Sequence, residues 1–495
     1  MRKYESLAHL QSGTDIRGKA YGENKELTSR AVKKIMMGYV EVLINKTGLY
    51  PYQMTVAVGH DTRLSSYRIR RNIFTILNHK GIKVIDCGTA STPGMYSAIE
   101  NLKCTASIEI TASHLPYDQN GLKFFTKDGG FEAEDIRRMI EIGEVMEIAH
   151  IKDNFTAEKI PCMKKYTNRL RYLTGKGVKN YIAPLSAYHI VVDAGNGVGG
   201  FFIRNVLEPL GADTSGSVCI VPDGTFPNHA PNPEDPEAMR SIREAVLAAN
   251  ADMGVIFDAD VDRAACVDCH GRELNRNKLI AVAAAIVLKN NPGGTIVTDS
   301  VTSEGLTDFI ENKLGGKHRR FKRGYKNVIN EAKRLEAEGV NCPLAIETSG
   351  HAAFRDNGFI DDGAYLMALI INFVVTSEYG RDAFDMLLKD YKEPAEEKEL
   401  RIKITAEDYK AYGEKVISDL EKYARDEQGW TIEEGYEGVR ISFDKEHGDG
   451  WLLLRMSLHE PILPLNAESN SQGGTDLILE QFTEFVKVYD LLEMP

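Results

Sequence analysis

Three carboxylates at alternate positions give the clearest chemical signal in the sequence. Asp258, Asp260 and Asp262 follow the apolar run 253–257 in the stretch DADVDR. On a tight turn beside a buried strand, they would repel one another unless a cation lay among them. Oxygen ligands of this kind suit Mg²⁺ better than Zn²⁺. The spacing therefore predicts a magnesium site, and a solvated acidic turn is the alternative.

A serine in the stretch TASH is the predicted partner of this cation. Mg²⁺ prefers to share its shell with phosphate oxygens, and a phosphorylated Ser113 would bring about −1.5 to −2 charges and three acceptor oxygens. An ordinary polar turn is one alternative, and a hydrolytic nucleophile is another, although Ser113 lacks the GxSxG frame. Asn120 and Gly121 favour a hairpin turn, which would fold Lys123 back toward the serine.

Two further stretches carry groups suited to a sugar phosphate. Glu347 and Ser349, in ETSGH, offer a carboxylate and a hydroxyl that suit neighbouring sugar hydroxyls. Arg455, Ser457 and His459 alternate along a predicted strand and turn, which could place three donors on one face toward an anion. A plain loop and an exposed strand are the alternatives.

The stretch GNGVGG, residues 195–200, fits the GxGxxG pattern. It follows the predicted strand 190–194 and opens a predicted helix, with Asp223 further along the chain. Dinucleotide binding is one interpretation. Tight packing of a strand against a helix uses the same glycines, so the motif alone leaves both open.

The order of predicted elements is strand, turn, helix in three successive regions, without a residue-level repeat. In the first region, residues 131–154 read as a helix that leads to a boundary near residue 165. The charged stretch 389–404 reads as a linker. The region after it mixes helices and strands in a different order, which predicts an α+β domain.

Length, charge and cysteine usage exclude several classes of protein. With 495 residues and 43% apolar content, the chain predicts three or four domains. A net charge of −12 without a block of Lys or Arg argues against a nucleic-acid partner. The apolar runs are shorter than a membrane span. Seven cysteines lack the spacing of a disulfide framework, and Cys266 with Cys269 is a CxxC without a second pair, so we expect a soluble protein in the reducing cytoplasm.

Taken together, these stretches resemble the α-D-phosphohexomutase superfamily across almost the whole chain. The resemblance implies three tandem mixed α/β domains and a C-terminal α+β domain around a central cleft. We expect these domains at residues 1–165, 166–290, 291–392 and 393–495. Seven stretches occur in the family's order: SGTDIRG, TASHLPYDQNGLKFF, PDGTFPNHAPNP, DADVDR, RGYKNVI, ETSGH and RMSLHEP.

The resemblance also implies a role for each matching residue. Ser113 would carry the phosphoryl group and, with Asp258, Asp260 and Asp262, would bind Mg²⁺. Catalysis would use Ser113 together with Lys123, Arg17 and His114. Substrate binding would use Glu347, Ser349, His351, Arg263, Tyr325, Lys326, Arg455, Ser457 and His459.

The implied activity is the interconversion of hexose 1-phosphate and 6-phosphate, with mannose or glucose as the sugar. It runs through a phosphoserine enzyme and a hexose 1,6-bisphosphate, which also serves as activator. Phosphoglucosamine mutase, a sugar-phosphate binding protein without turnover and a nicotinamide enzyme are the alternatives. The chain departs from the family pattern at Leu115, His459 and Pro464, which leaves phosphate affinity and sugar preference open. The sequence does not indicate an oligomeric state.

Overall fold

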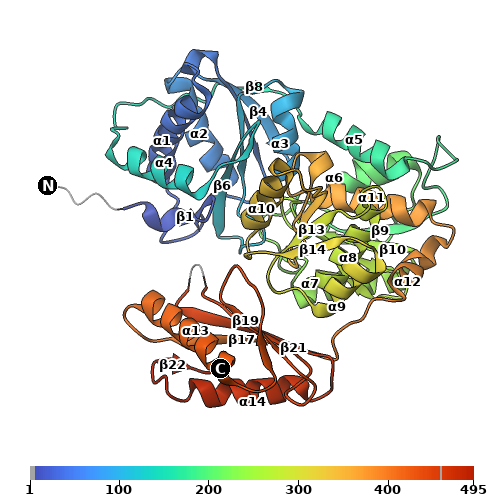
Figure 1. The fold of residues 1–495 in the computed structure, drawn as a ribbon. Coiled ribbons are helices and arrows are strands. Elements are labelled where there is room, and N and C mark those ends of the chain that lie inside the picture. Colours follow the sequence, from blue (N-terminus) through green and yellow to red (C-terminus); the bar gives the residue numbers. More distant parts are fainter. Residues whose placement is uncertain (1–5, 458–459) are drawn as a thin grey trace. The chain divides into compact units, whose positions relative to one another are not determined.

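The structure is a computed structural model that describes residues 6–457 and 460–495 (Figure 1). The chain forms two compact units. The first comprises Met1–Leu279 with Ser349–Met386, and the second comprises Ile280–Thr348 with Leu387–Pro495.

The first unit begins with a mixed eight-stranded sheet. Its order is β1-β2-β6-β5-β3-β4-β8, with β7 paired to β6. Strands β3, β4 and β5 are parallel, while β6 runs antiparallel to β5 and β2. The strands are β1 Gln11–Ser12, β2 Asp15–Lys19, β3 Thr55–His60, β4 Lys83–Thr89, β5 Ala106–Ile110, β6 Gln119–Thr126, β7 Gly129–Gly130 and β8 Glu158–Lys159.

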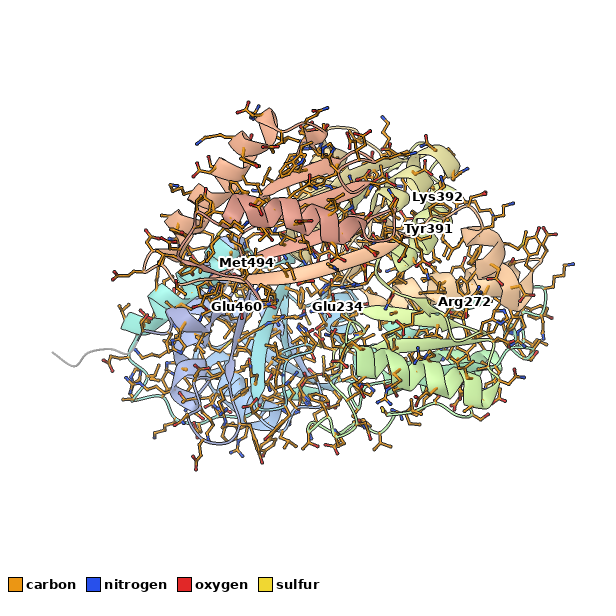
Figure 2. All side chains as sticks on the ribbon, turned by 90° about the horizontal axis from the view of Figure 1, so that it is seen from below. Glu234, Arg272, Tyr391, Lys392, Glu460 and Met494 are labelled. Carbon is orange, nitrogen blue, oxygen red and sulfur yellow. The ribbon has the colours of Figure 1, made fainter. Side chains whose placement is uncertain are left out.

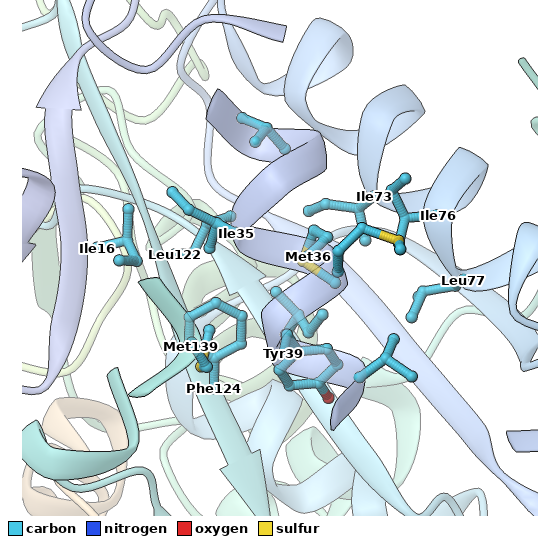
Figure 3. Close-up of a cluster of buried hydrophobic side chains, with 14 of the residues drawn as sticks. Ile16, Ile35, Met36, Tyr39, Ile73, Ile76, Leu77, Leu122, Phe124 and Met139 are labelled. Atoms are coloured by element: carbon cyan, nitrogen blue, oxygen red, sulfur yellow. The ribbon is translucent and has the colours of Figure 1, made fainter. Parts of the chain in front are cut away.

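Helices cover both faces of this sheet. Helices α1 (Ser29–Thr47), α2 (Ser66–His79) and α4 (Ala133–Val145) bury the larger core, in which Tyr39 stacks on Phe124 (Figure 3). Helix α3 (Thr92–Asn101) packs on the opposite face. Alternate residues of each strand supply the two cores, as the two-residue period of a strand requires.

A second sheet of the first unit has the order β12-β11-β10-β9, and α7 packs on one face of it. Strands β9 and β10 are parallel, and β10 and β11 form an antiparallel pair joined by the acidic turn, residues 258–263. The strands are β9 Ile190–Asp193, β10 Met253–Phe257, β11 Ala264–Asp268 and β12 Glu273–Leu274, with a further strand β16 Ala352–Phe354. The helices are α5 Met163–Gly175, α6 Gly200–Phe202, α7 Pro236–Ala249, α8 Arg276–Leu288, α11 Gly363–Thr376 and α12 Ala383–Leu388. Helices α8 and α12 begin in the first unit and end in the second.

The second unit contains a parallel set of strands in the order β14-β13-β15. Helix α10 begins directly after Gly324, and short helix α9 begins at a serine cap, where Ser303 accepts from the backbone of Leu306. The elements are β13 Thr295–Thr298, α9 Glu304–Asp308, β14 Lys317–Arg320, α10 Tyr325–Ala337 and β15 Leu344–Ile346.

The last region of the second unit is a six-stranded sheet of order β18-β19-β20-β21-β17-β22 with two helices on one face. In Figure 1 these elements run from orange to red. The elements are β17 Glu396–Ile404, α13 Tyr409–Asp426, β18 Trp430–Ile432, β19 Val439–Phe443, β20 Gly450–Leu454, β21 Ile462–Ser469, α14 Gly474–Val486 and β22 Leu492–Glu493.

Three α/β regions followed by an α+β region confirm the predicted fold class, while three local predictions were wrong. Residues 120–121 lie inside β6 and make no hairpin turn. The second half of the stretch 389–404 is β17, whose alternating charges occupy the exposed side of a sheet instead of a linker. The helix expected over 131–154 is α4, which ends at Val145 because the chain becomes extended at Met146.

Candidate active site

Ser113 lies in a loop directly after β5, at the carboxyl edge of parallel strands. Its backbone has φ of +52°, an uncommon conformation for a residue with a side chain. Its N–H donates to Thr111 Oγ1 at 2.9 Å, and its Oγ donates to Asp258 Oδ2 at 2.8 Å. The serine is fully buried. The loop therefore presents one hydroxyl to the acidic turn, in a conformation that the surrounding contacts impose.

Arg63 fixes this loop through hydrogen bonds to its backbone carbonyls, and no sequence pattern predicted this role. Its Nη2 donates to the carbonyls of Ser113 and Leu115, both at 2.6 Å, and its Nη1 donates to the carbonyls of Pro116 and Gln119. Four carbonyls on one rigid guanidinium fix the curvature of the loop. Leu115, one of the departures from the family pattern, contributes its backbone here.

Asp61 in turn fixes Arg63. Its Oδ2 accepts from Arg63 Nε at 3.0 Å and from Thr111 Oγ1 at 2.8 Å, and both charged side chains are fully buried. Burial raises the pKa of Asp61 and the nearby Arg63 lowers it, with burial the stronger influence. The only sequence signal for this pair was its position, directly after β3 at the edge where the serine loop also begins.

The three aspartates of the acidic turn converge in space. Their carboxylate oxygens lie within 4.8 Å of one another, and all three residues are buried. Val261, in the middle of the turn, has φ of +64°. Thr92 Oγ1 donates to Asp260 Oδ2 at 2.5 Å. A strained turn held by a neighbouring helix thus aims alternate side chains at one point.

This group fits a hard divalent cation. Among the residues that the structure describes, Asp260 Oδ1 and Asp262 Oδ1 are buried without a hydrogen-bond partner. Burial raises the pKa of Asp258 well above its ordinary value, and repulsion from Asp262 and Asp260 adds to this rise. Buried carboxylates without partners are costly. A cation bound by oxygen would remove that cost, and Ser113 Oγ offers a fourth oxygen.

Lys123 and Arg17 place positive charge beside this group. Lys123 Nζ lies 3.3 Å from Asp260 Oδ2 and forms a shorter ion pair with Asp262 Oδ2. Arg17 in β2 is opposite Gly121 in β6, so Arg17 and Lys123 point to the same side of the sheet. A Cβ at Gly121 would lie 2.7 Å from the Thr111 carbonyl. The glycine thus permits close approach of the serine loop, which explains it without a turn.

Arg263 connects two histidines at the site. Its Nη2 donates to His114 Nδ1 at 2.7 Å and its Nε donates to His351 Nε2 at 3.2 Å. Burial, followed by Arg263 and Arg17, lowers the pKa of His114 to about 2, and burial lowers the pKa of His351 well below its usual value. Both rings are therefore neutral. Because His351 Nε2 accepts, its Nδ1 carries the proton and donates to Ser349 Oγ at 2.8 Å.

Glu234, labelled in Figure 2, completes the surroundings of Arg263. Its Oε2 accepts from Arg263 Nη1 at 3.3 Å. The carboxylate belongs to the Pro-rich stretch before α7, in which the sequence analysis assigned no role to it. This contact helps to fix the guanidinium of Arg263, whose Nε lies 4.0 Å from Asp258 Oδ2.

Glu109 is a second residue that the sequence analysis missed. It lies on β5 opposite Lys123 on β6, it is fully buried, and both its carboxyl oxygens lack a hydrogen-bond partner within residues 6–457 and 460–495. Burial, with Asp61 and Asp260 adding repulsion, raises the pKa of Glu109 well above the usual range. Glu109 is therefore a neutral acid behind the charged site. A glutamate in an otherwise apolar strand, ASIEI, was the available signal.

The second unit carries the other predicted substrate residues. Glu347 follows β15, is buried, and accepts from the backbone N–H of Gly324 at 2.6 Å. Gly324 has φ of +113° and precedes Tyr325 and Lys326, the first residues of α10. The carboxylate thus lies at a helix N-terminus, which favours negative charge. Ser349 and His351 belong to the first unit.

Arg455 and Ser457 belong to what we call the Arg455 loop, residues 455–461 between β20 and β21. Strand β20 ends at Leu454, so Arg455 and Ser457 follow the strand instead of alternating along it. Arg455 N donates to the carbonyl of Pro464, which is inside β21, and Ser457 N donates to the carbonyl of Ile462. Arg455 and Ser457 are half-buried, and Glu460 at the loop end is exposed (Figure 2). His459 lies outside the described residues.

The glycine motif at residues 195–200 packs against the acidic turn. A Cβ at Gly197 would lie 2.6 Å from Ala259 Cα, and Val198 N donates to the Ala259 carbonyl at 2.9 Å. The glycines therefore support the turn that holds the aspartates. Helix α6 after them has three residues.

Comparison with known proteins gives the same family that the sequence resembles. Three family models match in order, described as phosphoglucomutase/phosphomannomutase, alpha/beta/alpha domains I, II and III, at residues 9–143, 166–271 and 275–393. The chain is 30% identical to a phosphomannomutase/phosphoglucomutase of Pseudomonas syringae over 91% of each chain. It is 32% identical to a phosphoglucomutase/phosphomannomutase of Thermococcus kodakarensis over 92% of this chain and 94% of the relative.

A solved structure agrees with these sequence matches. A phosphoglucomutase/phosphomannomutase family protein from Burkholderia thailandensis has a TM-score of 0.81, with 25% identity over 98% of this chain and 99% of that one. Fold and site therefore define an isomerase of the phosphohexomutase class. The chain belongs to the phosphoglucomutase/phosphomannomutase family of the α-D-phosphohexomutase superfamily. Among the described helices, none is both long and apolar enough to cross a membrane.

Proposed function

We propose that this phosphohexomutase interconverts the 1- and 6-phosphates of mannose or glucose through phosphorylated Ser113. The observation that carries the proposal is the 2.8 Å contact between Ser113 Oγ and Asp258 Oδ2, in a buried group of three aspartates. A hydroxyl placed against three carboxylates is poorly suited to hydrolysis. It is well suited to carrying a phosphoryl group whose charge a divalent cation offsets.

In the first half of the reaction, the phosphoryl group leaves Ser113 for a free hydroxyl of the bound hexose phosphate. The bond between phosphorus and Ser113 Oγ breaks, a bond to the sugar oxygen forms, and the hydroxyl proton ends on Ser113 Oγ. The product is a hexose 1,6-bisphosphate. The bound bisphosphate then changes its orientation, and its other phosphoryl group is transferred to Ser113. Such transfer depends mostly on positioning and charge stabilisation.

The chain's own residues supply the positioning. Arg63 fixes the serine loop through four carbonyls, and Lys123 and Arg17 carry positive charge on the side of the sheet next to the aspartates. The neutral His114 accepts from Arg263 at Nδ1, which lies 3.3 Å from Ser113 Oγ, so the ring borders the serine hydroxyl and adds no charge there, while Asp258 accepts the hydroxyl proton. Arg263 stays available to a phosphate oxygen.

Asp258, Asp260, Asp262 and Ser113 are the proposed ligands of Mg²⁺. The bound ion would supply charge neutralisation at the phosphoryl oxygens. The two partnerless oxygens of Asp260 and Asp262 support this assignment, because a hard cation is the simplest partner for buried carboxylate oxygens. Hexose 1,6-bisphosphate is the proposed activator, since it can phosphorylate Ser113.

The remaining residues are proposed to recognise the substrate. Glu347 would accept from sugar hydroxyls, together with Tyr325 and Lys326 at the start of α10. Ser349 would hydrogen-bond a sugar hydroxyl, and His351, whose two ring nitrogens pair with Arg263 and Ser349, would hold Ser349 in position for this contact. Arg455, Ser457 and His459 would bind the phosphate that is not transferred. We propose the domain boundaries given above and a cytoplasmic setting, which the seven free cysteines support.

Mass spectrometry and a substrate panel test the proposal together. We expect one added phosphate on the purified chain, mapped to Ser113, and Mg²⁺-dependent turnover of mannose and glucose 1-phosphates after priming with the bisphosphate. If glucosamine 6-phosphate were the only sugar phosphate converted, the enzyme would be a phosphoglucosamine mutase and the proposed substrates would be wrong. Binding of hexose phosphates without turnover of any would show a binding protein, and a copurified nicotinamide would favour a dinucleotide enzyme.

A further inference from the structure

A second group of side chains of the types that bind metals lies in the first unit, and none of its members is assigned to phosphoryl transfer. Asp193 ends β9, Cys219 lies in the loop that follows the β9 region, and His229 belongs to the stretch PNHAP. One ligand atom from each lies within 4.8 Å of the other two. Three separate segments of the chain thus bring a carboxylate, a thiol and an imidazole to one point.

The hydrogen bonds around this group leave the ligand atoms facing one another. His229 Nδ1 lies 2.7 Å from the carbonyl of Ala230, and because a carbonyl only accepts, Nδ1 carries a proton. His229 Nε2 then faces Asp193 Oδ2 at 3.0 Å. Backbone N–H of Gly195 donates to Asp193 Oδ1 at 2.9 Å, and Ser241 Oγ donates to Asp193 Oδ2 at 2.7 Å.

This pattern is the one that metal-binding histidines and carboxylates use. A ligating histidine usually donates its other ring N–H to a carbonyl, and ligating carboxylates are themselves hydrogen-bonded. Zinc bonds of about 2.0–2.2 Å to nitrogen and oxygen put two tetrahedral ligands roughly 3.3 Å apart. The observed separation of 3.0 Å between Nε2 and Oδ2 is close to this spacing. The side chains of Asp193 and His229 are 0% and 4% exposed, so the ligands are already held in place.

Cys219 supplies the ligand that decides which metal fits. Its backbone has φ of +50°, which sets the direction of its side chain, and the residue is half-buried. Thiolate with imidazole selects zinc and related thiophilic ions over Mg²⁺. The group therefore differs in chemistry from the all-oxygen aspartate group, and the two would not compete for one ion.

A cavity of about 890 Å³ opens beside two of the three residues, Cys219 and His229. Cys219, His229, Ser241, Asn228, Arg240 and Glu237 are among the residues that line it. Three protein ligands with access to solvent leave a fourth position for water or for a small anionic or thiol-containing ligand.

We propose that Asp193, Cys219 and His229 bind one thiophilic divalent cation, with Zn²⁺ as the best match, whose fourth position faces this cavity. Without such a cation the same residues form the Asp193–His229 ion pair, and the experiment separates the two states.

Metal binding to the full chain tests the proposal. After treatment with a chelator, the protein is dialysed against Zn²⁺ in the presence of excess Mg²⁺, which occupies the aspartate group. We expect one Zn²⁺ per chain. With Co²⁺ as a probe, we expect a near-ultraviolet sulfur-to-cobalt charge-transfer band. Cys219→Ser should remove the band, and it keeps the Asp193–His229 pair, so the fold should survive.

Cys269→Ser is the matched control, because Cys269 belongs to another Cys, His and Asp group, with His270 and Asp382. The band should persist in this variant. A missing band in the unmodified chain, a band that persists in Cys219→Ser, or one lost in Cys269→Ser would overturn the proposal.

Alkylation gives a second measurement that needs no variant. Zn²⁺ should slow the reaction of iodoacetamide with Cys219 at least tenfold, as followed by peptide mass. Equal rates with and without Zn²⁺ would mean that the residues form an ion pair alone. Neither readout uses mutase turnover, so failure here is distinguishable from failure of the proposed function.

Discussion

The Ser113 loop and the Arg455 loop differ in how they are held. In the Ser113 loop, residues 111–118, Ser113 itself is fully buried, and the position of the loop depends on side chains from distant parts of the sequence, chiefly Arg63 and Asp258. In the Arg455 loop, Arg455 and Ser457 are half-buried, and backbone hydrogen bonds to Pro464 and Ile462 of the adjoining strand β21 hold them. Phosphoryl transfer requires fixed distances, whereas a grip on a phosphate that does not react tolerates adjustment. The first loop should therefore control the rate, and the second should control affinity.

The largest expected effect is that of Ser113→Ala. Removing the hydroxyl that carries the phosphoryl group should lower turnover by roughly four orders of magnitude or more. Binding of hexose phosphate should change little, as titration calorimetry would show. Ser97→Ala, on α3, is the control and should keep full activity. Activity of the Ser113 variant equal to that of the unmodified enzyme would remove the serine from the mechanism.

The second-largest effect should be that of Asp260→Asn. Loss of one carboxylate should lower kcat about 10²-fold or more and raise the Mg²⁺ concentration needed for half-maximal rate, since an amide is a weaker ligand for a hard cation. Kinetics across a Mg²⁺ titration measure both. The Thr92 hydroxyl can still be bonded, so thermal unfolding should show a folded protein. An unchanged Mg²⁺ requirement would contradict the assigned ligand.

Arg63→Lys tests whether the buried support of the Ser113 loop controls rate. A lysine cannot reach four carbonyls in a plane, so the loop should shift, and a shift of about 1 Å can cost about 10²-fold in rate. We expect kcat to fall with little change in KM. Arg68→Lys is the matched control, because Arg68 also donates to backbone carbonyls, those of Ala20 and Leu27. If Arg63→Lys raised KM and left kcat unchanged, the Ser113 loop would not control the rate.

Arg455→Ala tests the other half of the comparison. Loss of a charged hydrogen-bond donor, worth about 1.5–3 kcal/mol, should raise KM about 10- to 100-fold. The value of kcat should fall less than in Arg63→Lys. Arg425→Ala, an exposed residue of α13, is the control. If kcat fell by the same factor as in the Arg63 variant, the two loops would not differ in function.

The smallest effect should come from Glu109→Gln. Glu109 is neutral when folded because burial, with Asp61 and Asp260 nearby, raises its pKa, against a lesser opposing effect of Lys123. An uncharged amide should therefore preserve activity near neutral pH.

Stability across pH distinguishes this variant from the unmodified chain. Above the carboxyl's ordinary pKa of about 4.3, the unfolded chain releases a proton that the folded chain retains, so Glu109 lowers stability as pH rises toward its folded pKa. The glutamine variant lacks this loss. Urea unfolding at about pH 5 and about pH 8 should show a gain for the variant that grows with pH. Glu100→Gln on the surface should show none.

Residues with informative neighbours in sequence were predicted, and residues that act through distant contacts were missed. DADVDR indicated three aspartates on one turn, and the structure brings them together beside Ser113. Arg63 acts through carbonyls about 50 residues away, and Asp61 acts through Arg63 and the Thr111 hydroxyl, so no spacing in the sequence could indicate them. The turn expected at Asn120-Gly121 was wrong because a glycine that permits close packing looks the same in sequence as one that permits a turn.

The sequence by itself determined the succession of α/β regions and the carboxylate group, because periodic apolar runs and closely spaced acids express local chemistry. The family followed from the resemblance of seven stretches in order. The tertiary structure alone decided three facts. Lys123 reaches the aspartates across a strand, Glu109 is buried with no hydrogen-bond partner in the described part of the chain, and Asp193, Cys219 and His229 meet. These facts depend on register and on loop paths. The register and the loop paths are set by the pairing of strands that lie far apart in the chain, and no local sequence pattern encodes that pairing.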